Sequence, residues 1–133
     1  MDNPGVYTLA SLAITADMPL SLLTPIDVLD GMTAVTIEAN FVRGTGGTSL
    51  YAIVATTFDE GSTWRHIARF DFTTSSRIAQ CNLSGLLSKG ITAYADLSAE
   101  GVNDGILGNQ LAVYLRSVGN YGGSTLSVRA SVR

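Results

Sequence analysis

The sequence predicts a single all-β domain over residues 1–133, an antiparallel β-sandwich of about eight strands with jelly-roll-like connections. Three observations predict this class. Apolar and polar residues alternate with a period of two through most of the chain, which is the pattern of half-buried strands. Turn signals rich in Gly, Asp, Asn and Ser interrupt these runs roughly every 10 to 15 residues. No stretch shows a sustained helical period with capping residues.

The first 30 residues are less regular than the rest. The run "VYTLASLAI" is strand-like, and the following "DMPLSLLTPIDVLDG" contains Pro19 and Pro25, which suit edges and bends rather than a central strand. Two interpretations of residues 1–30 stay open: a pair of edge strands that completes the sandwich, or an arm that packs along a neighbouring subunit. The apolar residues of such an interface would be Leu20, Leu22, Leu23 and Ile26.

The clearest strands lie in the middle and at the C-terminal end of the chain. In "TAVTIEANFVRG" the residues Val35, Ile37, Ala39 and Phe41 fall on one face and polar residues fall on the other. Residues 49–58 are apolar nearly throughout, which indicates a more central strand. Three further alternating runs are "TWRHIARFDF", "NQLAVYLRSV" and "STLSVRASVR".

The turn "TFDEGSTW" resembles the Asp-box, a motif written S/T-x-D-x-G-x-T-W. Its five defined positions are filled by Thr57, Asp59, Gly61, Thr63 and Trp64. In proteins that carry it, the motif forms a hairpin corner remote from any active site. The residue types fit that role, because an Asp carboxylate accepts hydrogen bonds from turn N–H groups and Gly permits a positive φ. We therefore interpret the five residues as a structural turn motif. Sialidases, the best-known carriers, are multi-bladed propellers, and this chain is too short to be one.

Composition and charge exclude several classes of partner. The formal net charge is -3, from eight Lys+Arg and eleven Asp+Glu, and no basic patch predicts nucleic-acid binding. No apolar stretch is long enough for a membrane span, and the N-terminus lacks the basic region of a secretory signal. The only cysteine, Cys81, alternates with apolar residues and is expected to be a buried small hydrophobe. The low charged fraction of 14% predicts either a surface rich in Ser, Thr and Gly or a face that contacts another subunit.

Candidate catalytic and metal-binding residues are few. His66 is the only histidine, and it falls in mid-strand, in phase with Trp64 and Phe70. No Gly-x-Ser-x-Gly elbow and no His/Cys cluster with zinc spacing is present. We therefore predict no enzyme activity, no cofactor and no required metal. A structural calcium ion at Asp104, in the loop "VNDGILGN", stays open.

A second resemblance spans about residues 48–133. The order of "TFDEGSTW", then "NLSG", "DGILGN" and the C-terminal "TLSVRA" is similar to a group of small all-β virion proteins of tailed phages and prophages. The sequence departs from that pattern at Glu60, where Gly is expected, and at Asn109, where Asp is expected. The resemblance implies a non-enzymatic virion structural protein, made in the host cytoplasm and assembled into the particle.

The sequence leaves the place of such a protein in the virion open. The leading hypothesis is a capsid decoration or cement protein, a trimer or other homo-oligomer that contacts the major capsid protein or other virion proteins. Arg116 and Arg129 are candidate interface residues, because Arg is favoured at protein interfaces. The alternatives are a tail or neck component and a carbohydrate-binding sandwich module. A glycan site would use Tyr94, Tyr114 and Tyr121.

Overall fold

The computed structural model describes residues 3–133, which form eleven β-strands and no helix. The sequence prediction of an all-β sandwich is therefore confirmed, although the strand count is eleven rather than about eight. Eight strands have five or more residues. The other three have two residues each and are too short to show an alternating pattern. The eight longer strands are β1 (Gly5–Ile14), β2 (Met18–Leu22), β3 (Ala34–Val42), β5 (Ser49–Thr56), β6 (Arg65–Phe72), β7 (Arg77–Ser84), β9 (Leu111–Val118) and β11 (Ser124–Val132). The short ones are β4 (Thr45–Gly46), β8 (Gly101–Val102) and β10 (Tyr121–Gly122).

The longer strands are connected as a jelly roll. The first pairs with the last (β1 with β11), and the pairing continues inward as β2 with β9, β3 with β7, and β5 with β6. Every pair is antiparallel, so the chain behaves as one long hairpin wound around itself. Two cross-pairings, β11 with β3 and β9 with β5, then join the turns of this hairpin into sheets. The expected jelly-roll-like connections are present.

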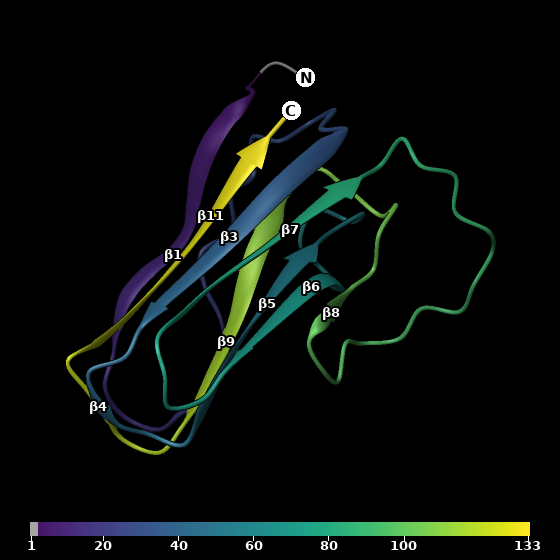
Figure 1. The fold of residues 1–133 in the computed structure, drawn as a ribbon. Coiled ribbons are helices and arrows are strands. Elements are labelled where there is room, and N and C mark those ends of the chain that lie inside the picture. The colour runs from purple at the N-terminus through teal and green to yellow at the C-terminus, as the bar shows by residue number, and fades with distance from the viewer. Residues whose placement is uncertain (1–2) are drawn as a thin grey trace.

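Two sheets form the layers of the sandwich (Figure 1). One has the order β1-β11-β3-β7 and the other has the order β2-β9-β5-β6-β8. A third, two-stranded sheet pairs β10 with β4 and joins the loops that the sequence marks as "RGTGGTS" and "GNYGGS". A side chain at Gly47 would overlap the ring of Tyr121, so this close approach needs a glycine.

The core lies between the two large sheets and follows the predicted alternation. Val35, Ile37, Ala39 and Phe41 of β3 are all fully buried, while the residues between them are partly exposed. Phe41 lies at the centre of an aromatic group, with ring centroids 5.4 Å from Phe72 and 5.6 Å from Tyr121. The hydroxyl of Tyr121 donates a hydrogen bond to the backbone oxygen of Thr73 at 2.7 Å, so the polar end of this buried ring is satisfied.

The N-terminal segment forms edge strands of the same sandwich. β1 lies at the edge of the four-stranded sheet and β2 at the edge of the five-stranded sheet. Leu20 and Leu22 on β2 are exposed, whereas Leu23 and Ile26 pack against the core. Ile26 also exchanges two backbone hydrogen bonds with Leu111, at 2.8 and 3.1 Å. Of the four predicted interface residues here, Leu20 and Leu22 remain accessible to a partner.

Candidate functional site

The Asp-box corner joins β5 to β6, and its side chains form a closed hydrogen-bond network. The Asp59 carboxylate accepts from the hydroxyl of Thr57 at 2.9 Å, from the backbone N–H of Thr63 at 2.9 Å and from the Thr63 hydroxyl at 2.6 Å. The hydroxyl oxygen of Thr57 accepts in turn from the backbone N–H groups of Gly61 at 2.9 Å and Asp59 at 3.3 Å. The hydrogen bond from the Thr63 hydroxyl is the largest of the effects that lower the pKa of Asp59 to about 2.

Two consecutive residues of the corner have left-handed backbone conformations, Glu60 with φ of 58° and Gly61 with φ of 93°. A Cβ at Gly61 would lie 3.5 Å from Cζ2 of Trp64, so the glycine sits against the edge of that half-buried ring. Glu60 stands where the sequence pattern leads us to expect Gly, and it adopts a conformation that costs a non-glycine residue about 1–2 kcal/mol. The motif therefore tolerates this departure at the expense of local strain.

The corner packs on the "DGILGN" loop, and the contacting residues Thr56 and Gly108 are 52 positions apart in the chain. The buried Thr56 hydroxyl accepts the backbone N–H of Gly108 at 2.8 Å and donates to the backbone oxygen of Gln110 at 2.9 Å. A Cβ at Gly108 would overlap the carbonyl oxygen of Thr57. The two motifs that carry the family resemblance are thus one structural unit, held together by a backbone contact that only glycine permits.

The two polar side chains of the "DGILGN" loop are also engaged within the fold. The Asp104 carboxylate accepts the backbone N–H groups of Ser84 at 2.9 Å and Gly105 at 2.8 Å. The Asn109 amide donates to the carboxylate of Asp30 at 3.0 Å, and an Asp at this position would place two like charges together. Among residues 3–133, no group of three or more His, Cys, Asp or Glu side chains is placed to hold a metal ion.

His66 lies on the outer face of the five-stranded sheet and ties a long loop to β6. Its backbone N–H donates to the Tyr94 hydroxyl at 2.7 Å, and that hydroxyl donates to Asp96 at 2.7 Å. Nδ1 of His66 accepts the backbone N–H of Leu97 at 3.1 Å, while Nε2 lies 3.9 Å from the Asp96 carboxylate. Burial lowers the pKa of His66, and Nδ1 serves as a hydrogen-bond acceptor. The geometry is that of a positioned structural histidine.

The predicted aromatic and Arg residues are divided among three places. Tyr94 and Tyr114 flank His66, with ring centroids 6.5 and 5.9 Å from its ring, whereas Tyr121 is buried in the core. Arg116 is also on this face, opposite Tyr51 in the register of β9 and β5. Arg129 lies on the outer face of the other sheet, opposite Glu38. The structure therefore brings together two of the three tyrosines, and it places the two arginines on opposite sides of the sandwich.

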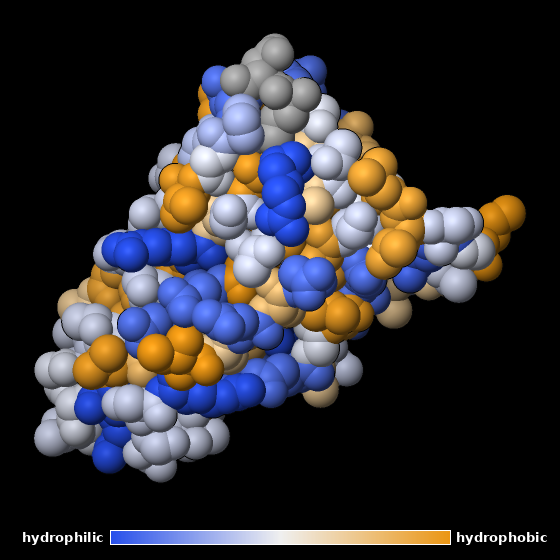
Figure 2. Space-filling model, turned by 45° about the horizontal axis from the view of Figure 1, so that its top comes forward, coloured by the Kyte–Doolittle hydropathy of each residue, from blue (hydrophilic) through white to orange (hydrophobic). Residues whose placement is uncertain are grey.

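The feature that sequence reasoning missed is the projecting loop, which we define as residues 85–100 between β7 and β8. Figure 1 shows it extending to the right of the sandwich, and in Figure 2 apolar atoms lie at its tip. Leu86, Leu87 and Ile91 are 77%, 58% and fully exposed. The signal in the sequence is "GLLSKGITAYA", in which apolar residues occur without a strand or helix period.

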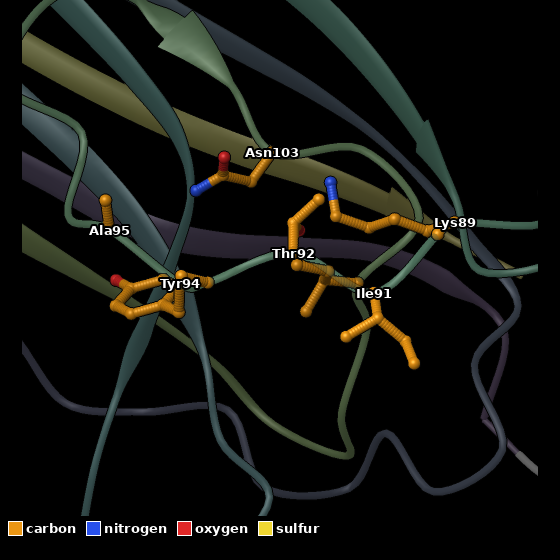
Figure 3. A pocket seen from close by; sticks show the side chains of 9 residues that line it. Lys89, Ile91, Thr92, Tyr94, Ala95 and Asn103 are labelled. Carbon is orange, nitrogen blue, oxygen red and sulfur yellow. The ribbon is translucent and has the colours of Figure 1, made fainter.

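The return arm of the projecting loop is anchored and its tip is not. Arg69 donates to the backbone oxygen of Leu97 at 3.1 Å, and Glu100 accepts the backbone N–H of Asp71 at 3.2 Å. Glu100 also pairs with the Arg77 guanidinium through contacts of 2.6 and 3.1 Å. The loop encloses an open hollow of about 250 Å³, which the Lys89 side chain enters while Ile91 points away from Asn103 (Figure 3). Hydrogen bonds therefore fix the return arm of the loop against the sheet, while the apolar tip extends into solvent.

Searches of protein-family models and of curated proteins give no match to the chain. Residues 3–133 also contain no helix long and apolar enough to cross a membrane.

Proposed function

We propose that this chain is a non-enzymatic structural protein of a tailed-phage virion, which decorates and cements the capsid as a homo-oligomer. The observation that carries the proposal is the projecting loop, because a domain with a complete core of its own presents Leu86, Leu87 and Ile91 to solvent on an anchored support. Large apolar side chains that are gathered on one exposed segment are typical of interaction sites, whereas singly scattered ones are ordinary surface. The resemblance of residues 48–133 to small virion proteins supports the same function.

The chemistry of the rest of the molecule is consistent with a role in assembly. The Asp-box residues are used in stabilising a corner, and the ring of His66 is used in holding a loop backbone. The jelly roll itself is found in both viral capsid proteins and lectins, so it supports the proposal without selecting it. The capsid surface and a second copy of the chain are the expected partners, and no cofactor enters the proposal.

Quantitative mass spectrometry of purified particles from the phage that encodes the chain tests this function. We expect the chain in many copies per particle, in fixed proportion to the major capsid protein. A second preparation should carry Leu87→Asp and Ile91→Asp, with Phe58→Asp as the matched control, because Phe58 is also exposed but lies on the Asp-box corner. Loss of occupancy in the loop variant alone supports the proposal. A copy number of only one small ring per particle would indicate the tail or neck, and absence from particles would refute a virion role.

One observation favours a second candidate, a carbohydrate-binding module. Tyr94 of the projecting loop and Tyr114 of β9 both lie near His66, and the Arg65 guanidinium lies 5.1 Å from the centre of the Tyr94 ring. Aromatic rings with neighbouring polar groups can bind sugar rings by stacking. Calorimetric titration with glycans would detect this activity, and Tyr114→Ala should remove it while Tyr7→Ala, on the other sheet, should not.

A further inference from the structure

Strand β7 is an edge strand with part of its backbone unpaired. Within residues 3–133 it pairs only with β3. At its end, the Gly85 N–H donates to Thr33 on the β3 side, whereas the Ser84 N–H points the other way, to Asp104. Backbone groups alternate in direction along an antiparallel strand, so those of Asn82, Gln80 and Ile78 also point away from β3. These three residues therefore offer donors and acceptors for one more strand.

This edge lacks the devices that usually protect an edge strand. β7 contains no proline, no lysine and no bulge in its register with β3. By contrast β2 is short and contains Pro19, and β1 has a register shift between Thr8 and Ala10. An eight-residue edge without such features is an expected site of strand addition.

A shelf lies beside β7, between the edges of the two large sheets. We use "shelf" for the open hollow of about 430 Å³ between residues 77–81 of β7 and residues 100–102 around β8. Its apolar lining comes from Phe70, Ile78, Ala79, Cys81 and Val102. Its charged side chains are neutralised within the molecule, because Arg77 pairs with Glu100 at 2.6 Å and Arg69 pairs with Asp71 at 2.8 Å. The shelf therefore fits an extended, nearly uncharged segment.

The projecting loop has the properties of such a segment. Residues 86–93 belong to no strand, and of them only Leu86 takes part in a hydrogen-bonded turn. Lys89 is the only charged residue in this range. In an extended conformation, Leu87, Lys89 and Ile91 would share one side. Eight extended residues span roughly 26 Å, which is enough to cover the free part of β7.

Residues 86–93 do not line the shelf of their own molecule. Asp104 and Gly105 contact both β7 and the loop: Asp104 occupies the backbone N–H of Ser84, and the Leu87 oxygen and Lys89 Cβ lie within 3.5 Å of the position of a Cβ on Gly105. The loop is therefore directed away from β7 and is available to a second molecule. Because the loop and the shelf are neighbours, two copies related by a twofold axis could exchange loops reciprocally.

We infer that the projecting loop of one copy of this chain adds as a strand to the free edge of β7 on a second copy, with apolar side chains of the loop in the shelf. This contact rests on the proposed function in so far as that function requires a homo-oligomer. It names the surfaces through which the copies would meet. Each buried edge residue would gain backbone hydrogen bonds, and Ile78, Val102, Leu87 and Ile91 would lose their exposure to water.

Disulfide trapping with the native Cys81 tests the contact, because it is the only cysteine and it lines the shelf. Single cysteines are introduced at each position from Leu86 to Thr92, and the purified full-length variants are oxidised mildly. A disulfide forms only between residues whose Cα atoms approach to about 4.4–6.8 Å. We expect covalent dimers linked to Cys81 from one position, Leu87→Cys, Lys89→Cys or Ile91→Cys, and little from its neighbours, because extended residues advance about 3.3 Å each. Ser62→Cys, on the exposed Asp-box corner, is the control and should give no link to Cys81.

Three results would overturn the inference: no link to Cys81 from any loop position, equal yields at every position including Ser62→Cys, or a link within one molecule. A second measurement avoids introduced thiols. Light scattering should show self-association of the unmodified chain, and Leu87→Asp or Ile91→Asp should weaken it at least tenfold while Phe58→Asp leaves it unchanged. A monomeric unmodified chain would overturn the inference as well.

These outcomes are separable from those that test the virion role. A chain that is abundant on particles but fails the cysteine scan is a virion protein that assembles through another surface. A chain that passes the scan but is absent from particles associates with itself for another purpose.

Discussion

The Asp-box corner and the projecting loop both connect β-strands at the surface, yet they are built in opposite ways. In the corner, the polar side chains of Thr57, Asp59 and Thr63 are bonded to one another and to the backbone. In the loop, the tip has no such network, and large apolar side chains face solvent. The polar groups of the corner already have hydrogen-bond partners within the domain, so a second protein would add little stabilisation there. The exposed apolar side chains of the loop would be stabilised by burial against a partner. The comparison separates residues that maintain the fold from residues that are free to serve assembly.

The largest difference between the two regions should come from identical glycine substitutions. Gly108→Ala places a Cβ on the carbonyl oxygen of Thr57, so the corner or the "DGILGN" loop must move, and we expect a loss of about 3 kcal/mol or more in unfolding free energy. Gly90→Ala in the loop meets no atom within 4 Å and should change stability by no more than about 1 kcal/mol, in the stabilising direction. Urea denaturation of both variants measures the contrast. Equal effects would show that the two motifs are not in close contact.

The next largest effect is expected at the hydroxyl of Thr57. Thr57→Val preserves the shape of this buried side chain but leaves the partly buried N–H of Gly61 without its acceptor, at a cost of about 1–3 kcal/mol. The matched change in the loop, Thr92→Val, removes a solvated hydroxyl and should be close to neutral. If both variants melt at the temperature of the unmodified protein, the Thr57 network does not stabilise the corner.

Acidification should remove the contribution of Asp59. Its pKa is lowered to about 2 in the folded protein from an ordinary value of 3.8, so the charged carboxylate favours folding. That stability is complete above pH 3.8 and is lost as the pH falls through about 2. Asp59→Ala should therefore be less stable than the unmodified protein at pH 6, and the difference should shrink between pH 4 and pH 2. Asp17→Ala provides a control on a carboxylate outside the corner. A difference that stays constant with pH would show that the charge of Asp59 is unimportant.

A smaller effect, with the opposite sign, is expected at Glu60. Glu60→Gly relieves a left-handed non-glycine residue and should raise the unfolding free energy by about 1 kcal/mol. Glu60→Ala removes the same carboxylate but keeps the backbone strain, so it should bring no such gain. A gain from both variants would assign the effect to charge instead of conformation.

The sequence predicted the parts of the fold that depend on local pattern. Alternation identified the long strands, for example β3 with Val35 and Phe41 facing inward, and the motif "TFDEGSTW" identified a corner whose five residues do lie together. The jelly-roll order could be expected only in outline, since it depends on which strands pair over long distances.

The misses have a common physical origin, because each depends on a contact between distant segments. The prediction of Tyr121 as a glycan residue needs an exposed ring, but the glycine at position 47 admits this ring to the core. The short strands β4, β8 and β10 are defined by their partners and have no pattern of their own. The partner of Asn109, Asp30, lies 79 residues away and could not be inferred from the motif.

The smallest effect on stability is expected in the projecting loop, where it also tests most directly the contrast with the Asp-box corner. Leu86→Ser and Leu87→Ser replace side chains that are already mostly in water, so each should change the unfolding free energy of the dilute protein by less than about 0.5 kcal/mol. Leu83→Ala, only a few residues earlier on β7 but fully buried, should cost about 2–5 kcal/mol.

The measurement is a urea titration at low protein concentration, repeated at high concentration. If the loop is an assembly element, the serine variants match the unmodified protein when dilute and fall behind it when concentrated, because only the unmodified chain is then stabilised by association. A loss of more than about 1.5 kcal/mol in the dilute samples would mean instead that these leucines pack within their own domain, because surface changes away from such packing stay within about 0.5 kcal/mol.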